Sequence, residues 1–111
     1  MPDVMADRRV NPRYPLILVA AVTEVASGMK LNARTSDVSR TGCYIDSLNP
    51  MPAGTPICVK LIQGGEEVEV RGTVMYVSPG LGMGVAFEEN MPLSQRVILE
   101  RWLETAARSD L

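Results

Sequence analysis

The sequence predicts a mainly β protein: a six-stranded antiparallel β-barrel with one C-terminal α-helix packed on it. Three observations support this prediction. Between residues 15 and 88, apolar residues alternate with polar ones or form short aliphatic runs, as they do in strands. Turn-forming glycine, proline and serine residues separate these runs. After residue 92 the apolar period becomes helical. Because so many strands in a short chain would leave exposed edges, we expect them to close into a barrel.

Six stretches have the composition of strands, and turn residues bound each of them. The six stretches are 16–25, 30–38, 43–47, 57–62, 66–78 and 81–87. Turns are expected at Ser27-Gly28, Gly64-Gly65 and Pro79-Gly80, and a proline-rich loop at 48–56. In the longest stretch, strict alternation assigns five residues to the apolar face: Val68, Val70, Gly72, Val74 and Tyr76.

Residues 92–107 are expected to form the helix, with Pro92 in its first turn. The apolar residues of this segment form one stripe that should pack on the barrel: Leu93, Val97, Ile98, Trp102, Leu103 and Ala106. The expected domain therefore spans residues 7–107, with an N-terminal arginine arm at 7–14 and the barrel at 15–88. Residues 1–6 are interpreted as a flexible lead and residues 108–111 as a frayed tail.

The composition argues against several classes of function. The chain has 111 residues, 46% hydrophobic and 22% charged, which suits one globular domain. Its apolar run Pro15–Val22 is too short to span a bilayer and lies too deep for a signal peptide, so a cytoplasmic location is expected. The absence of histidine argues against an enzyme and a metal site. Cys43 and Cys58 fit no metal or redox motif and are expected to be buried thiols.

Positive charge is concentrated near the N-terminus of this mildly acidic chain. Residues 1–40 contain six basic and four acidic side chains, whereas the remainder contains five basic and nine acidic ones. Arg8, Arg9 and Arg13 lie close together in the segment DRRVNPRY, where two prolines disfavour a helix. Such a local cluster suits a small anionic ligand better than nucleic acid, which is usually bound along a broad basic face. The single phenylalanine, three tyrosines and single tryptophan are also few for a platform that binds single strands.

A second motif lies in TSDVSRTG (residues 35–42), between two expected strands. Asp37, Ser39 and Gly42 form the pattern D-x-S-x-x-G. Asp and Ser hydrogen-bond to local backbone, and Gly permits a positive φ or a close approach by another group. A tight turn is therefore enough to explain this motif when it is taken alone.

Taken together, the two motifs carry a family resemblance. The arginine pair R-x-x-x-R (Arg9 and Arg13), then D-x-S-x-x-G, then strands that include GMGVAF, and finally a helix resemble the PilZ domain family, whose members are bacterial receptors for cyclic di-GMP. The resemblance covers nearly the whole chain, from Asp7 to about Ala106, and implies the same barrel-and-helix fold.

The resemblance also implies roles for individual residues. Arg9 and Arg13 would bind phosphate and a guanine edge, which a planar guanidinium can do with two parallel hydrogen bonds. Asp37 would accept hydrogen bonds from guanine N1–H and N2–H2. Ser39 would hold backbone or a guanine, and Gly42 would leave room for the ligand. The arm would fold over the ligand and become ordered on binding.

Four further residues belong to the predicted site. In the family, an arginine directly before R-x-x-x-R goes with an intercalated pair of ligand molecules, so Arg8 favours two; alternatively it is a solvated arm residue. Arg40 could add charge near the ligand or remain a solvated turn residue. Met83 and Gly84 lie on a strand that the family places near the site. Met83 could pack on a guanine face, or it could be a core or surface methionine.

The expected function is a cyclic di-GMP receptor or adaptor that changes conformation on binding and signals to an unidentified protein partner. It would have no enzymatic activity, no cofactor, no metal, no nucleic acid partner and no membrane insertion. The alternative is an interaction module of the same fold that does not bind nucleotide. A third hypothesis is a small barrel that binds single-stranded nucleic acid.

Overall fold

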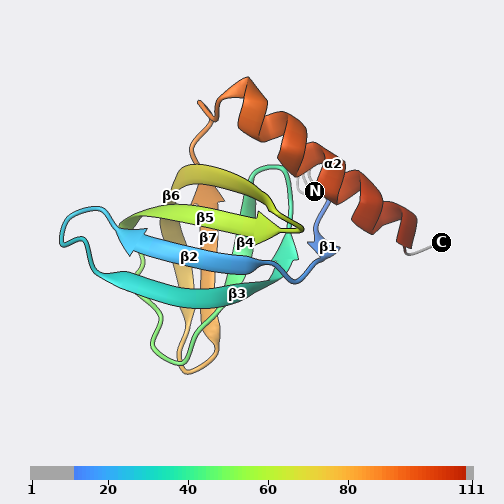
Figure 1. The fold of residues 1–111 in the computed structure, drawn as a ribbon. Helices are drawn as coiled ribbons and strands as arrows, with labels where there is room; N and C mark the ends of the chain where they lie inside the picture. The colour runs from blue at the N-terminus through green and yellow to red at the C-terminus, as the bar shows by residue number, and fades with distance from the viewer. Residues whose placement is uncertain (1–11, 110–111) are drawn as a thin grey trace, which may run out of the picture.

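The computed structural model describes residues 12–109, which form a β-barrel and one long helix lying across it (Figure 1). The elements are β1 (Tyr14–Pro15), β2 (Val19–Glu24), β3 (Lys30–Val38), β4 (Gly42–Asp46), β5 (Pro56–Gln63), β6 (Glu66–Ser78), β7 (Gly82–Phe87) and α2 (Leu93–Ser109). The mainly β class and the C-terminal helix are therefore as predicted.

The sheet closes on itself through six strands. Its order is β1-β3-β2-β5-β6-β7-β4, and a further antiparallel pairing of β3 with β4 joins the two ends. The short strand β1 lies outside this ring and pairs with the last residues of β3, Tyr14 opposite Val38 and Pro15 opposite Asp37. The predicted six-stranded antiparallel barrel is thus confirmed, with β1 as one extra strand.

The local sequence explains the tightest connection. Gly64 and Gly65 join β5 to β6, and both have positive φ, 58° and 83°. A two-residue hairpin turn needs this backbone to match the right-handed twist of its strands, and glycine adopts it without strain. Gln63 and Glu66 face each other across the turn.

The barrel interior is filled by aliphatic side chains that alternate along the strands. Leu18, Val59, Leu61, Val68 and Val74 are among those that are essentially inaccessible. Packing of this kind excludes water and contributes about 1.5–3 kcal/mol for each large side chain buried.

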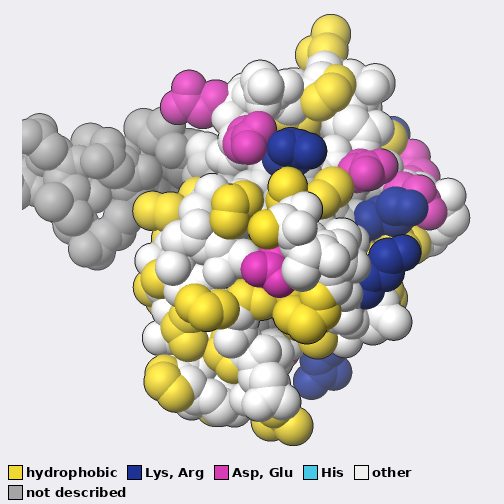
Figure 2. Space-filling view, turned by 90° about the vertical axis from the view of Figure 1, so that its left-hand side faces the viewer, with side chains coloured by type: hydrophobic (Ala, Val, Ile, Leu, Met, Phe, Trp, Pro, Cys, Tyr) yellow, Lys and Arg dark blue, Asp and Glu magenta, His cyan; other side chains and the backbone are white. Residues whose placement is uncertain are grey.

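Figure 2 shows one side of the molecule, where hydrophobic side chains are interspersed with polar ones and most of the Lys and Arg side chains seen lie toward one edge.

Two β-bulges interrupt the alternation and change which residues face outward. In β3 the register shifts between Thr35 and Asp37, and in β6 it shifts between Val74 and Tyr76. Each bulge inserts one unpaired residue, so the next residue points to the opposite face. The prediction that Tyr76 belongs to the apolar inner face is therefore wrong: its side chain is 44% exposed on the outside.

The chain between β1 and β2 is held by one buried threonine. The Thr35 hydroxyl donates a hydrogen bond to the Leu16 carbonyl at 2.7 Å and accepts one from the Leu18 amide at 2.9 Å. The strand expected at 16–25 therefore begins only at Val19, because the Leu16 carbonyl and the Leu18 amide bond to a side chain and not to a neighbouring strand. Thr35 therefore determines where the arm leaves the barrel.

Helix α2 packs against β6 and β1. Trp102 and Leu103 of the predicted stripe are buried and Ile98 packs against the core, so this part of the prediction is confirmed. Leu99, Trp102 and Leu103 are buried, whereas Leu93 and Val97 are 76% and 52% exposed. Because Val97 lies roughly 160° from Leu99 around the helix axis, both cannot face the barrel.

Polar contacts add to this packing. Arg101 donates hydrogen bonds to both carboxylate oxygens of Glu66 at 2.8 and 2.9 Å, which lower the pKa of Glu66. The helix also continues to Ser109, beyond the expected end at Ala107.

We predict that Thr35→Val lowers the free energy of unfolding by about 1–3 kcal/mol. Valine matches the shape of threonine, but it leaves the Leu16 carbonyl and the Leu18 amide without their partner. Urea denaturation at neutral pH measures the change. Thr55→Val is the control, because its hydroxyl bonds to the Pro52 carbonyl at an exposed site, and it should change stability by less than about 0.5 kcal/mol. Equal effects would contradict the bridging role of Thr35.

A second prediction concerns the buried thiol of Cys43. Burial raises the pKa of Cys43 from 9.0 to about 12. Below pH 9 the thiol is protonated in both folded and unfolded chains. Above pH 9 only the unfolded chain releases this proton, so stability falls with a slope of up to about 1.4 kcal/mol per pH unit.

Urea denaturation between pH 8.5 and 10.5 should therefore show a steeper loss of stability for the wild type than for Cys43→Ala. The comparison of slopes removes the cost of the smaller side chain and the titration of other groups. Parallel curves would show that the thiol is not protected in the folded state.

Candidate functional site

A row of four residues crosses the outer wall of the barrel. The strand pairings place Asp37 opposite Tyr44, Tyr44 opposite Gly84 and Gly84 opposite Tyr76. The row thus runs from β3 through β4 and β7 to β6. Asp37 and Tyr76 face outward because each directly follows one of the two bulges.

Asp37 and Arg13 form an ion pair at one end of this row. The distance from Arg13 Nε to Asp37 Oδ1 is 3.7 Å, and the two side chains are 50% and 32% exposed. This distance is too long for a hydrogen bond. Asp37 Oδ1 is fully buried and has no hydrogen-bond partner among residues 12–109. A buried carboxylate oxygen without a donor is costly, and in native proteins it calls for a specific explanation.

Arg13 also interacts with the other end of the row. A hydrogen bond to Tyr76 raises the pKa of Arg13, and the nearby Asp37 carboxylate raises it further. The guanidinium therefore stays charged while half of its surface remains open to solvent. Together, Arg13, Asp37 and Tyr76 present a cation, an acceptor and an aromatic ring on one patch of the wall.

Two glycines of β7 let tyrosine rings lie against the wall. A Cβ atom at Gly84 would overlap the ring of Tyr76, and one at Gly82 would come within 2.7 Å of the Tyr44 ring. The two rings are neighbours, with centroids 6.2 Å apart and planes tilted by 35°. Because it has no side chain, Gly84 lets the Tyr76 ring pack directly on the backbone of β7.

Met83 does not reach this patch. Its side chain is completely buried and packs in the barrel core, because it lies between Gly82 and Gly84 and points to the inner face. The suggestion that Met83 packs on a guanine is therefore wrong, and the core alternative holds.

The D-x-S-x-x-G turn is stabilised by its own residues. The Ser39 hydroxyl accepts hydrogen bonds from the backbone amides of Thr41 and Gly42 at 3.2 and 3.1 Å. Ser39 is buried and therefore holds backbone. At Gly42 the place of a Cβ is taken by the Val85 carbonyl of β7. Gly42 is thus required by barrel closure, and the space we had expected it to leave for a ligand is filled by a neighbouring strand.

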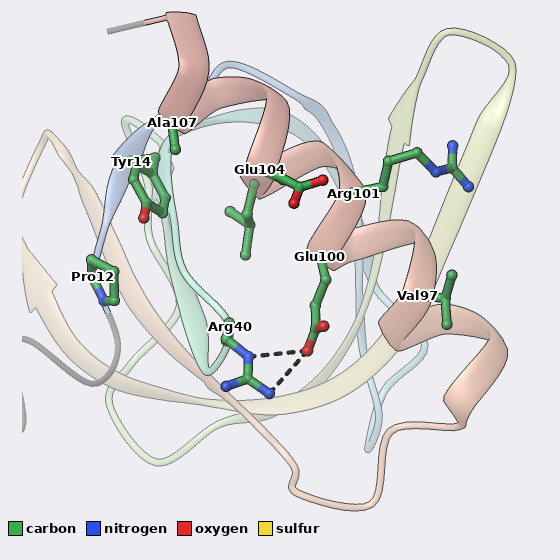
Figure 3. A pocket seen from close by; sticks show the side chains of 9 residues that line it. Pro12, Tyr14, Arg40, Val97, Glu100, Arg101, Glu104 and Ala107 are labelled. Atoms are coloured by element: carbon green, nitrogen blue, oxygen red, sulfur yellow. Dashed lines mark hydrogen bonds and ion pairs between the residues drawn. The ribbon is translucent and has the colours of Figure 1, made fainter. Parts of the chain in front are cut away.

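Arg40, in the same turn, is engaged by helix α2. Its Nε and Nη2 atoms lie 3.0 and 2.9 Å from Glu100 Oε2. The pair borders a groove of ≈ 640 Å³ between α2 and the start of β1, which is also lined by Pro12, Tyr14 and Val97 (Figure 3). Arg40 is therefore neither a free turn residue nor, in this state, part of the Arg13–Asp37 patch.

Two predicted site residues, Arg8 and Arg9, lie outside residues 12–109, so the structure says nothing of their positions. Within the described range, no group of three or more Cys, Asp or Glu side chains is placed to hold a metal ion. No helix in that range is long and apolar enough to cross a membrane.

Tyr76 and Tyr44 were not among the site residues predicted from the sequence. Alternation alone assigns Tyr76 to the interior, and only a bulge turns it outward. A signal was nevertheless present, because the two glycines of GMGVAF occupy positions where a neighbouring strand or ring comes close. A planar, hydrogen-bonding, anionic group could bind this patch, since Arg13 can bind an acceptor edge and the Asp37 carboxylate accepts from donors.

Comparison with solved structures shows the same fold. The PilZ domain of YcgR from Escherichia coli, determined with cyclic di-GMP, superposes with a TM-score of 0.73 at 16% identity, covering 93% of this chain and 94% of that one. The PilZ domain of CeSA from a cellulose-synthesizing bacterium gives 0.62 at 17% identity, covering 89% and 98%. The Bacillus subtilis inhibitor of motility, MotI/DgrA, gives 0.71 at 11% identity, covering 93% of this chain and 51% of that one.

No curated protein matches the chain. The sequence model of the PilZ domain, in contrast, matches residues 7–105, nearly the whole length. This match includes the arginine arm, the barrel with its outer row, and most of α2. The chain therefore belongs to the PilZ domain family.

Proposed function

We propose that this protein is a cyclic di-GMP receptor that binds its ligand on the outer wall of the barrel, around Arg13, Asp37 and Tyr76. One observation carries the proposal: the buried Asp37 Oδ1 lacks a hydrogen-bond donor among residues 12–109, while Arg13 lies opposite it at 3.7 Å. The site thus offers a hydrogen-bond acceptor and a cation that do not hydrogen-bond to each other. The structure of the YcgR domain with cyclic di-GMP supports the choice of ligand.

The chemistry of guanine suits this patch. An ionised carboxylate only accepts hydrogen bonds, and guanine presents two neighbouring donors at N1–H and N2–H2. The guanidinium of Arg13 can bind guanine O6 and N7, or a phosphate, through two parallel hydrogen bonds. The half-exposed ring of Tyr76 offers a face on which a base can stack.

Arg8 and Arg9 complete the proposed site from the arm. The arm enters the barrel at β1, directly beside Asp37, since Pro15 pairs with that residue. Arg9 would bind phosphate together with Arg13. Arg8 would bind a second, intercalated ligand molecule, because a further guanidinium can form two parallel hydrogen bonds with one guanine and stack as a cation on another.

The proposed output is a conformational change that a protein partner recognises. Ordering of the arm on the ligand would alter the surface between β1 and α2, which contact each other. The receptor would need no cofactor and would catalyse no reaction, and it would act in the bacterial cytoplasm, where this second messenger is made.

Calorimetric titration with cyclic di-GMP, with GTP as the control ligand, tests the proposal. We predict selective binding, and about two ligands per chain if Arg8 has the proposed role. Arg13→Ala should weaken affinity by about fivefold to 150-fold, the equivalent of one lost bidentate contact. Its melting temperature should hardly change, because a half-exposed ion pair contributes little to stability.

Lys60→Ala is the control for this titration. Lys60 of β5 is also a half-exposed cation paired with a carboxylate, Glu67 of β6 at 3.9 Å, but Glu67 lies nine residues from Tyr76 along β6. Its affinity should remain that of the wild type. No binding by the wild-type protein would overturn the receptor proposal and favour an interaction module that does not bind nucleotide.

A further prediction separates the two contributions of Tyr76. Tyr76→Ala removes the ring and should weaken binding by about 1–3 kcal/mol, the usual value of one stacked base. Tyr76→Phe keeps the ring and loses only the hydroxyl near Arg13, so its loss should be smaller. The same titration measures both, and equal losses would show that Tyr76 acts through its hydroxyl without stacking.

A further inference from the structure

Arg40 connects the D-x-S-x-x-G turn of the proposed site to helix α2. It lies in the turn between β3 and β4, three positions after Asp37, and Ser39 next to it fixes the turn backbone. Its guanidinium points toward α2, where two of its nitrogen atoms contact the Glu100 carboxylate (Figure 3). The turn thus carries a second arginine whose partner is a helix residue.

We propose that Glu100 is an internal competitor of the ligand for Arg40. On binding, a ligand phosphate replaces the Glu100 carboxylate on Arg40, and helix α2 loses this contact with the turn. The inference rests on the proposed function and deepens it, because it names the residue pair that links ligand occupancy to α2.

The exposure of the pair makes such an exchange feasible. The Arg40 and Glu100 side chains are 50% and 42% exposed, so water weakens their attraction. Ion pairs of this kind are worth little to stability. Both Arg40 nitrogens reach the same carboxylate oxygen, Oε2, which is not the parallel two-oxygen arrangement. A phosphate with two free oxygens can offer that stronger arrangement.

Residues 12–14 contact both this groove and the proposed ligand patch. Pro12 and Tyr14 line the groove with Arg40 and Glu100, whereas Arg13 between them pairs with Asp37 on the outer wall. One short segment therefore contacts α2 on one side and the proposed ligand site on the other.

The rest of α2 has its own attachments, which explains why the exchange need not detach the whole helix. Arg101 bonds to Glu66 of β6, and Gln95 accepts a hydrogen bond from the Glu69 amide at 2.6 Å. These contacts lie on the β6 side of the helix. Loss of the Arg40–Glu100 pair is therefore expected to loosen α2 only beside the turn and β1.

The test compares cyclic di-GMP affinities by calorimetry in four variants of the full chain. Glu100→Gln removes the competitor and should tighten binding by about two- to fivefold, the range set by an exposed ion pair. Glu104→Gln is the matched control, since Glu104 lines the same groove but pairs with Arg108 of α2 itself at 3.6 Å. Any gain due only to a less negative surface would appear equally in both.

Arg40→Gln and the double variant Arg40→Gln/Glu100→Gln complete the cycle. Arg40→Gln should weaken binding, and adding Glu100→Gln to it should have no further effect. Equal affinities for Glu100→Gln and Glu104→Gln, or a gain that persists without Arg40, would overturn the inference while leaving the receptor proposal standing. Absence of binding by the wild type would overturn both.

Hydrogen exchange of α2 provides a second readout that does not rely on affinity. In the ligand-free protein, Glu100→Gln should exchange faster than the wild type in the helix turns around residue 100. Saturating cyclic di-GMP should bring the wild type to the level of Glu100→Gln. Unchanged exchange of α2 in the ligand-bound wild type would contradict the release of Arg40.

Discussion

The pairing of β3 with three other strands is the constraint on which the rest of this structure depends. β3 joins β2 on one edge and β4 on the other, which closes the barrel, and its last residues also hold β1. A closed barrel has no free strand edge, so its register cannot slip without turning every side chain over. Within that fixed register, a single bulge in β3 is enough to send Asp37 outward while Thr35 and Val38 remain buried.

The same strand explains how the arm is aimed at the site. Thr35 fastens the chain between β1 and β2 from inside the barrel, and Pro15 pairs with Asp37 on the outside. Arg13 therefore emerges next to the carboxylate that it partly neutralises. Asp37 Oδ1 still lacks a hydrogen-bond donor, which lowers the stability of the folded barrel locally. Unsatisfied buried groups of this kind tend to occur at functional positions.

Much of this could be predicted from the sequence, and the failures have identifiable physical causes. The bounds of β3 and β6 were predicted to the residue, because β-branched alternation and glycine turns are strong local signals. Tyr76 was assigned to the wrong face, since a bulge depends on pairing between distant strands. The helix stripe was predicted only in part for a similar reason: Trp102 and Leu103 are buried, but Leu93 and Val97 lie away from the side that meets β6 and β1.

The two motifs were recognised as a site, but their residues divide into different roles. Asp37 and Arg13 form the patch, Ser39 holds the turn, and Gly42 admits the Val85 carbonyl. Spacing along the chain cannot separate these roles, because a turn residue and a ligand residue fit the same pattern. Nor could it reveal that Arg40 is paired with a helix sixty residues later.

The central claim is that ligand binds on the outer wall across β3, β4, β7 and β6, and nuclear magnetic resonance tests it most directly. Cyclic di-GMP would be titrated into isotope-labelled protein while backbone amide signals are followed. The account predicts that the largest shifts fall on Asp37, Tyr44, Gly84 and Tyr76. It would be contradicted if the largest shifts fell instead on β2 and β5, around Ala21 and Lys60, with the Asp37 row unchanged.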